Sequence, residues 1–163
     1  MKRTLILVRH AKSSWDSLDL PDTERPLADR GKRDAPIMGK RLAKQQGKPD
    51  LILSSPARRA LTTAEIIASK LGYQTKDIVV DDRLYATDPE TLLAVIGGLS
   101  DKLKCVLLFG HNPEISELAH RLSTDIALLP TCSVAQFTFE SKSWATIGSV
   151  KAEEVVLDYP KKE

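Results

Sequence analysis

The chain has 163 residues, of which 42% are hydrophobic and 28% are charged. This composition excludes a disordered or collagen-like chain, and the length predicts a single domain over residues 1–163. Because 24 Lys and Arg nearly balance 22 Asp and Glu, the net charge of +2 does not favour a broad surface for nucleic acid or membranes.

The near-neutral total hides a charge asymmetry along the chain. Residues 1–70 contain 15 Lys and Arg but 8 Asp and Glu, whereas residues 71–163 contain 9 and 14. Such a distribution is typical either of a local anion site or of two faces of unlike sign, and composition alone leaves both interpretations open.

The two cysteines, Cys105 and Cys132, lie in apolar or mixed stretches. This placement favours buried free thiols over a disulfide and suits a reducing compartment, so we expect a cytoplasmic protein. The apolar run at residues 5–8 ends at Arg9 and is shorter than the core of a signal peptide. No run approaches the roughly 18 apolar residues of a membrane span.

Apolar runs alternate with helical patterns through the first three quarters of the chain. The predicted strands lie at residues 5–8, 50–54, 78–80 and 105–109. The predicted helices lie at residues 31–46, interrupted near the start by Pro36, and at 56–71, 89–96 and 113–122. This alternation predicts an α/β fold in which helices flank a parallel sheet.

The last quarter of the chain has a different pattern. Residues 134–139, 144–150 and 155–157 alternate between apolar and polar side chains. A period of two predicts further strands at the edge of the sheet, as a hairpin or an antiparallel pair.

Polar side chains follow three of the predicted strands, at residues 9–12, 54–59 and 110–113. Binding sites in open α/β sheets lie beyond the carboxyl ends of the strands, so these groups converge if the strands are neighbours. Two imidazoles and several guanidiniums would then form a pocket for a dianion, because the planar fork of Arg matches phosphate oxygens. A neutral imidazole in such a pocket is also a nucleophile.

No acidic cluster suited to Mg²⁺ lies at these three strand ends. The sequence therefore favours phosphoryl transfer in which arginines and a second histidine neutralise the charge, with no metal and no cofactor.

Four motifs in order resemble those of the histidine phosphatase superfamily, which contains cofactor-dependent phosphoglycerate mutases and acid phosphatases. They are Leu7-Val8-Arg9-His10-Ala11, Arg25-Pro26-Leu27 with Arg30-Gly31, residues 54–60 with the second family arginine at Arg59, and Gly110-His111-Asn112. The small size and the opening Arg-His-Ala-Lys-Ser-Ser-Trp are most similar to the SixA-type phosphohistidine phosphatases.

The resemblance implies a three-layer α/β/α sandwich, with a mainly parallel sheet and an antiparallel edge. It implies that His10 is the nucleophile and that Arg9, Arg59 and His111 bind the phosphoryl group, with Arg25 reaching in from the long loop. Lys12 is a further candidate for substrate binding. The neighbouring Arg58 and the helical His120 are expected to lie outside the site, although a shift of the motif by one residue would exchange Arg58 and Arg59.

Two positions depart from the family pattern. The family glycine after the catalytic histidine is Ala11 here. The acidic proton donor of larger members has no clear counterpart, and Asp82, Asp88 and Glu90 are unranked candidates.

Trp15 either packs over the pocket or anchors the loop.

We therefore expect a metal-independent phosphatase that acts through a phospho-His10 intermediate, on a phosphohistidine-bearing protein or a small phosphorylated compound. A phosphate-monoester phosphatase or mutase of the same family is one alternative. A non-catalytic phosphate-binding interaction module is the other.

Overall fold

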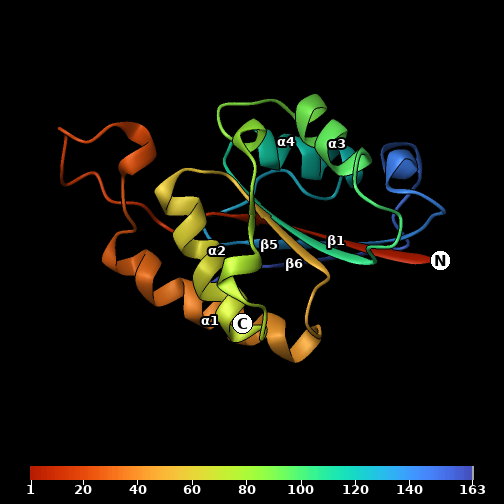
Figure 1. Cartoon of the computed structure of the whole chain (residues 1–163), viewed down its shortest axis with the longest axis horizontal. Helices are drawn as coiled ribbons and strands as arrows, with labels where there is room; N and C mark the ends of the chain where they lie inside the picture. The colour runs from red at the N-terminus through yellow and green to blue at the C-terminus, as the bar shows by residue number, and fades with distance from the viewer. Residues whose placement is uncertain (163) are drawn as a thin grey trace.

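The computed structural model describes residues 1–162 and contains one mixed sheet of six strands in the order β3-β2-β4-β1-β5-β6 (Figure 1). Strands β1 to β4 run parallel, whereas β5 and β6 are antiparallel to their neighbours, as the sequence pattern predicts. The strands are β1 (Lys2–Arg9), β2 (Leu51–Ser54), β3 (Val79–Val80), β4 (Cys105–Gly110), β5 (Val134–Glu140) and β6 (Glu154–Asp158).

Helices cover both faces of this sheet. Figure 1 shows α1 and α2 on one side and α3 and α4 on the other. Their bounds are α1 (Asp29–Gln45), α2 (Arg58–Lys70), α3 (Pro89–Gly97) and α4 (Glu114–Leu122). The expected three-layer α/β/α sandwich is therefore confirmed.

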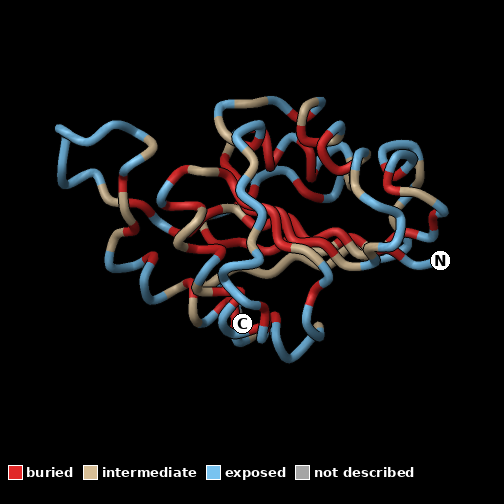
Figure 2. Tube along the Cα trace, in the orientation of Figure 1, coloured by how far each residue is buried: buried red, intermediate tan, exposed pale blue. Residues whose placement is uncertain are grey.

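The central strand β1 is buried on both faces, which explains why its residues are continuously apolar rather than alternating. Leu5 and Leu7 pack into the core beneath α3 and α4. Ile6 and Val8 pack into the second core, beneath α1 and α2. Figure 2 shows the middle strands buried along most of their length. A rigid sheet of this kind fixes the directions in which its strand ends point.

Two predictions about local structure are wrong. Pro36 does not interrupt α1, which is one continuous helix from Asp29 to Gln45. Its buried face packs on α2 closely enough for Gly39 to approach Ile67, and this packing outweighs the backbone hydrogen bond that proline cannot donate. The segment expected as a strand at 144–150 forms a 3₁₀ helix, Trp144–Ser149, against α3.

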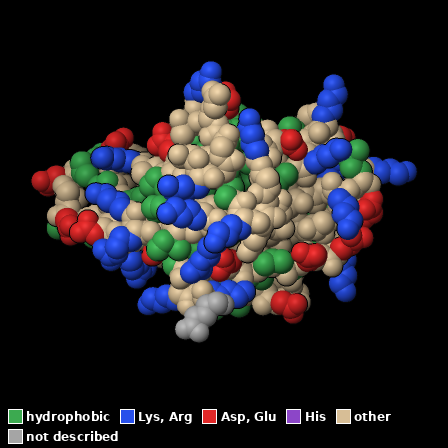
Figure 3. Space-filling view, turned by 90° about the horizontal axis from the view of Figure 1, so that it is seen from below, with side chains coloured by type: hydrophobic (Ala, Val, Ile, Leu, Met, Phe, Trp, Pro, Cys, Tyr) green, Lys and Arg blue, Asp and Glu red, His purple; other side chains and the backbone are tan. Residues whose placement is uncertain are grey.

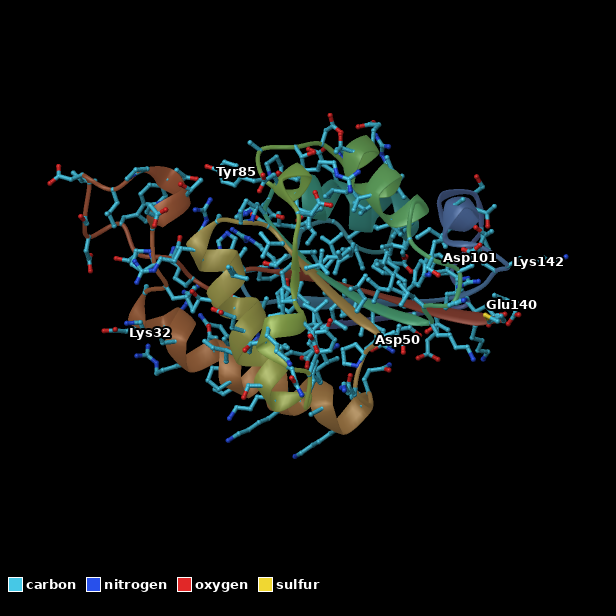
Figure 4. The ribbon with its side chains drawn as sticks, in the orientation of Figure 1. Lys32, Asp50, Tyr85, Asp101, Glu140 and Lys142 are labelled. Atoms are coloured by element: carbon cyan, nitrogen blue, oxygen red, sulfur yellow. The ribbon has the colours of Figure 1, made fainter. Side chains whose placement is uncertain are left out.

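The basic residues of the N-terminal half serve several purposes. Arg3 is almost fully buried at the start of β1, where its guanidinium donates to the carbonyl oxygens of Asp101 at 2.8 Å and Lys142 at 2.7 Å. Figure 4 labels both of these residues, at the end of the molecule where β1 starts. Figure 3 shows other Lys and Arg side chains spread among Asp and Glu on the face seen from below. Much of the basic excess is therefore structural or surface charge.

Two further expectations concern the state of the two thiols and the lack of a membrane-spanning helix. Both thiols are free, with Cys132 buried and Cys105 partly buried. Within residues 1–162, no helix is both long and apolar enough to cross a membrane.

Gly31 allows α1 to begin directly against the loop that follows β1. A β-carbon at this position would lie 2.2 Å from the Lys12 carbonyl oxygen, which already accepts a hydrogen bond from the Ala28 amide. The backbone must therefore shift if any side chain is added. Because this loop carries residues of the candidate site, Gly31 links the helix packing to the site geometry.

We expect Gly31→Ala to lower the free energy of unfolding by about 1–3 kcal/mol, because the added methyl group overlaps a backbone atom. Gly47→Ala is the matched control, since a β-carbon there would meet nothing within 4 Å. Urea denaturation of both variants measures the difference. An equal effect of the two substitutions would contradict the conclusion that a side chain at Gly31 overlaps the backbone.

Candidate active site

The adjacency of β1 and β4 brings the two motif histidines together. Arg9 at the end of β1 pairs with Gly110 at the end of β4, and His10 and His111 follow directly. The His10 amide donates to the Gly110 carbonyl at 3.1 Å, and the two imidazole centroids lie 5.1 Å apart. The prediction that these strand ends converge is confirmed.

A pocket of about 200 Å³ lies at this convergence. It brings together all six residues predicted for catalysis or substrate binding, and it adds four further side chains. Its lining consists of Arg9, His10, Lys12, Ser13, Trp15, Arg25, Arg59, His111, Asn112 and Thr131. A wider groove of about 700 Å³ lies between the end of α4 and β6, but its lining contains no histidine. The smaller pocket is therefore the candidate active site.

His10 is held in one tautomer by its own backbone. Its Nδ1 lies 2.7 Å from the Ala11 carbonyl oxygen, which can only accept a hydrogen bond, so Nδ1 carries the proton in the neutral ring. The lone pair is consequently on Nε2. Burial, together with the positive charges of Arg59, Arg9 and Arg25, lowers the pKa of His10 to about 4. The ring is therefore neutral, and Nε2 can act as a nucleophile, at ordinary pH.

His111 is fixed by the loop after β2. Its Nε2 lies 2.7 Å from the Ser55 Oγ, which also accepts a hydrogen bond from the Ala57 amide at the start of α2. The Nδ1 atom is buried and makes no hydrogen bond to the described residues. Burial and the nearby charges of His10 and Arg59 lower the pKa of His111 to about 3. The ring of His111 is therefore neutral, with its Nε2 held by Ser55 and its Nδ1 buried without a partner among the described residues.

Arg59, in the first turn of α2, is buried and points into the site, whereas its neighbour Arg58 is exposed. Its Nη1 donates to the Asp22 carbonyl at 2.8 Å and its Nη2 to the Asp22 carboxylate at 2.9 Å. The sequence prediction that Arg58 lies outside the site is consistent with this arrangement.

Arg25 reaches the pocket from the long loop between β1 and α1. Its Nη1 donates to the Ser13 hydroxyl at 2.8 Å. Its guanidinium lies 3.5 Å from the ring centroid of Trp15, within the range of a cation–π interaction. Trp15 thus both lines the pocket and anchors the loop through Arg25, so the two interpretations from sequence are compatible.

Arg9 and Asn112 fix a further part of the pocket lining. Both side chains donate to the Leu129 carbonyl, at 2.9 Å and 3.0 Å respectively. This shared acceptor holds in place the loop before β5, which contributes Thr131 to the pocket. His120 does not line the active-site pocket, and its Nδ1 lies 2.7 Å from the Ile126 carbonyl oxygen.

Sequence reasoning missed Asp22 and Tyr85. The Asp22 carboxylate accepts hydrogen bonds from Tyr85 at 2.5 Å, from Arg59, and from Arg25 at 3.1 Å. These contacts, led by the Tyr85 hydroxyl, hold the pKa of Asp22 well below its usual range. Figure 4 shows Tyr85 on the side of the molecule where the long loop lies. The signal in the sequence is weak, because Asp22 stands among other acidic loop residues.

The three suggested proton donors do not line the pocket. Asp82 is exposed, Asp88 accepts from the Thr91 amide at the start of α3, and Glu90 pairs with Arg121. Asp22 lies closer, but a carboxylate that is so strongly held in its ionised form is unsuited to donate a proton.

The charge pattern of the site is that of an anion pocket. Three guanidiniums and two neutral imidazoles face one small space. Within residues 1–162, no three His, Cys, Asp or Glu side chains gather as metal ligands would. The arrangement can bind a phosphoryl group and place a nucleophilic nitrogen beside it.

We expect the imidazole of His10 to titrate near pH 4 rather than 6.5 in an NMR titration, with the His10→Gln spectrum identifying its signal. The unfolded chain binds this proton near pH 6.5, so the free energy of unfolding should fall as the pH is lowered from about 6.5 to about 4. A midpoint near 6.5 would show that the ring is not buried among the arginines.

Replacement of Asp22 should strengthen anion binding. In Asp22→Asn the negative charge is lost and Arg59 is released, so we expect the Kd for orthophosphate to fall about three- to tenfold. Isothermal titration measures this, with Asp19→Asn in the same loop as the control. Weaker binding would instead mean that Asp22 holds the arginines in their binding positions.

The chain is similar to proteins of one known family. The family model of the histidine phosphatase superfamily (branch 1) matches residues 5–88. An uncharacterized chloroplastic protein of Arabidopsis thaliana is 34% identical over 152 residues, which cover 88% of this chain and 70% of that protein.

Solved structures share the fold over nearly the whole chain. A protein assigned as the phosphohistidine phosphatase SixA of Nakamurella multipartitia has a TM-score of 0.87 and 22% identity, over 99% of this chain and 98% of that one. One assigned as SixA of Agrobacterium tumefaciens has a TM-score of 0.79 and 25% identity, over 94% and 97%. The chain therefore belongs to branch 1 of the histidine phosphatase superfamily and is similar to its SixA-type members.

Proposed function

We propose that the protein is a metal-independent phosphohistidine phosphatase with a covalent phospho-His10 intermediate. The observation that carries the proposal is the His10 tautomer: a neutral ring with its Nε2 lone pair unprotonated, in a pocket with three guanidiniums. Family membership supports phosphatase chemistry in general. The phosphohistidine substrate is our inference from the similarity to SixA-type members and from the groups at the site.

The reaction has two balanced steps. The Nε2 of His10 attacks the substrate phosphorus, so a P–N bond to His10 forms while the P–N bond of the substrate breaks, and the leaving imidazole takes up a proton from solvent. Water then attacks the phosphorus, which breaks the bond to Nε2, returns the lone pair to His10, and releases orthophosphate and a proton to solvent. Arg9, Arg25 and Arg59 offset the charge on the transferred oxygens, the task that Mg²⁺ performs in other phosphoryl transfers.

The lack of a protonated carboxyl at the pocket favours this substrate. An imidazole leaves a phosphorus atom more easily than an alkoxide does, so a phosphoramidate needs less acid assistance than an alkyl phosphate. Asp22, the carboxylate that accepts hydrogen bonds from Arg25 and Arg59, is held ionised. A protein of this site geometry is therefore better suited to a phosphohistidine than to a sugar phosphate.

Two other functions are compatible with the family. A phosphate-monoester phosphatase or mutase would need a group that protonates the alkoxide, and the candidates Asp82, Asp88 and Glu90 do not line the pocket. A non-catalytic phosphate-binding module would have no need of a neutral nucleophilic imidazole. The substrate itself is a phosphorylated histidine-containing protein or a small phosphorylated compound.

The central experiment follows turnover of a histidine-phosphorylated domain, of a sugar phosphate and of p-nitrophenyl phosphate, each with wild type and His10→Ala. We expect wild type to prefer the phosphohistidine substrate over the sugar phosphate, and His10→Ala to lose about 10³-fold or more of the activity because the nucleophile is gone. EDTA should have no effect.

His120→Ala is the matched control and should retain wild-type activity, because its ring lies outside the pocket. Activity that survives His10→Ala would overturn the nucleophile assignment. Similar kcat/KM values for sugar phosphates and phosphohistidine would overturn the substrate class, and no turnover of either substrate would favour the binding module.

A further inference from the structure

A second cavity continues from the active-site pocket along the surface. It is a groove of about 460 Å³ between the start of α1 and the segment after β6. Thr131 lines both the groove and the active-site pocket. The Arg30 guanidinium donates to the Thr131 hydroxyl at 2.9 Å, so the junction between the two cavities is an ordered contact. We call this cavity the Arg33 groove.

The Arg33 groove is positively charged. Arg30, Arg33 and Lys161 line it against one carboxylate, that of Asp34. Asp34 lies 3.8 Å from the Arg30 guanidinium, whereas no ion pair engages Arg33 or Lys161 within residues 1–162. The groove therefore presents two cations beside the active site that its own carboxylate does not offset.

One wall of the groove is apolar and held in place. Tyr159 and Pro160 form this wall, and Pro130 is the other apolar residue of the lining. Arg41 of α1 donates to the carbonyl oxygens of Tyr159 at 3.0 Å and Pro160 at 3.2 Å. These contacts, together with the ion pair from Arg41 to Asp158 at 3.3 Å, bind the segment to α1. A fixed wall is suited to recognition, because little ordering is needed when a partner binds.

The size of the two cavities bears on what binds in the groove. The active-site pocket, at about 200 Å³, has less than half the volume of the Arg33 groove. A phosphohistidine side chain that enters the pocket therefore leaves the polypeptide that carries it on the surrounding surface. The Arg33 groove is the part of that surface joined to the pocket through Thr131.

We propose that the Arg33 groove binds an acidic segment of the substrate protein that lies next to its phosphohistidine. This inference rests on the proposed function and adds the chemistry of the partner: carboxylates that face Arg33 and Lys161, with an apolar side chain against Tyr159. Charge complementarity of this kind affects the choice of partner and the rate of association more than it affects the rate of the chemical step.

The test removes the two cations and leaves the active site intact. The double variant Arg33→Gln/Lys161→Gln is compared with Lys32→Gln, which removes an exposed charge from the same helix outside the groove. Three substrates are used: a histidine-phosphorylated domain with Asp or Glu beside the phosphohistidine, the same domain with those residues changed to Asn or Gln, and free phosphohistidine.

We expect the double variant to raise KM for the acidic domain about five- to twentyfold without a change in kcat. For free phosphohistidine, kcat/KM should stay within about twofold of wild type, because the pocket residues are untouched. The neutralised domain should already show the raised KM with wild type, and the double variant should add little. Lys32→Gln should resemble wild type throughout.

Any other result contradicts the proposal that the Arg33 groove binds an acidic segment of the substrate. An unchanged KM for the acidic domain would show that the groove is not used. An equal loss with free phosphohistidine would indicate a disturbed pocket, and an equal effect of Lys32→Gln would indicate only the general surface charge. If wild type hydrolyses no phosphohistidine substrate at all, the proposed function fails, and the groove inference fails with it. This outcome is distinguishable from a failure of the groove inference alone, because it appears with wild type before any variant is made.

Discussion

The parallel pairing of β1 with β4 is the constraint on which the site depends. Because Arg9 and Gly110 are opposite each other in this pairing, the residues that follow them, His10 and His111, leave the sheet side by side. A slip of one residue would send each side chain to the other face of the sheet. The two cores, which bury residues 5–8 of β1 on both faces, hold that register.

The second constraint is the concentration of positive charge beside neutral imidazoles. Burial together with Arg9, Arg25 and Arg59 keeps the protonated form of His10 unfavourable, so the groups that bind an anion also keep the nucleophile free. Asp22 offsets part of this charge at the rim and links Arg25, Arg59 and Tyr85. Folding brings these charges close together, and the carboxylate reduces their mutual repulsion.

Much of this site was accessible from the sequence, because its parts are local. A buried strand followed at once by a polar group is recognisable without knowledge of the fold, and three such strand ends carry Arg9, His10, Arg59 and His111. Local patterns were misleading where packing decided the outcome. Pro36 is accommodated within α1 because the helix packs on α2, and residues 144–150 alternate like a strand yet form a 3₁₀ helix against α3.

The sequence by itself determined the α/β class, the chemical groups at the strand ends and the excess of arginine near them, because these follow from the order of residues along the chain. The charge asymmetry alone left open whether it marked an anion site or two unlike faces. Only the tertiary structure decided that Arg3 is structural, that Asp22 and Tyr85 adjoin the pocket, and that a basic groove continues from it. Those arrangements depend on contacts between residues far apart in the chain. Local sequence patterns do not predict such contacts, because they describe only residues that are close together in the sequence.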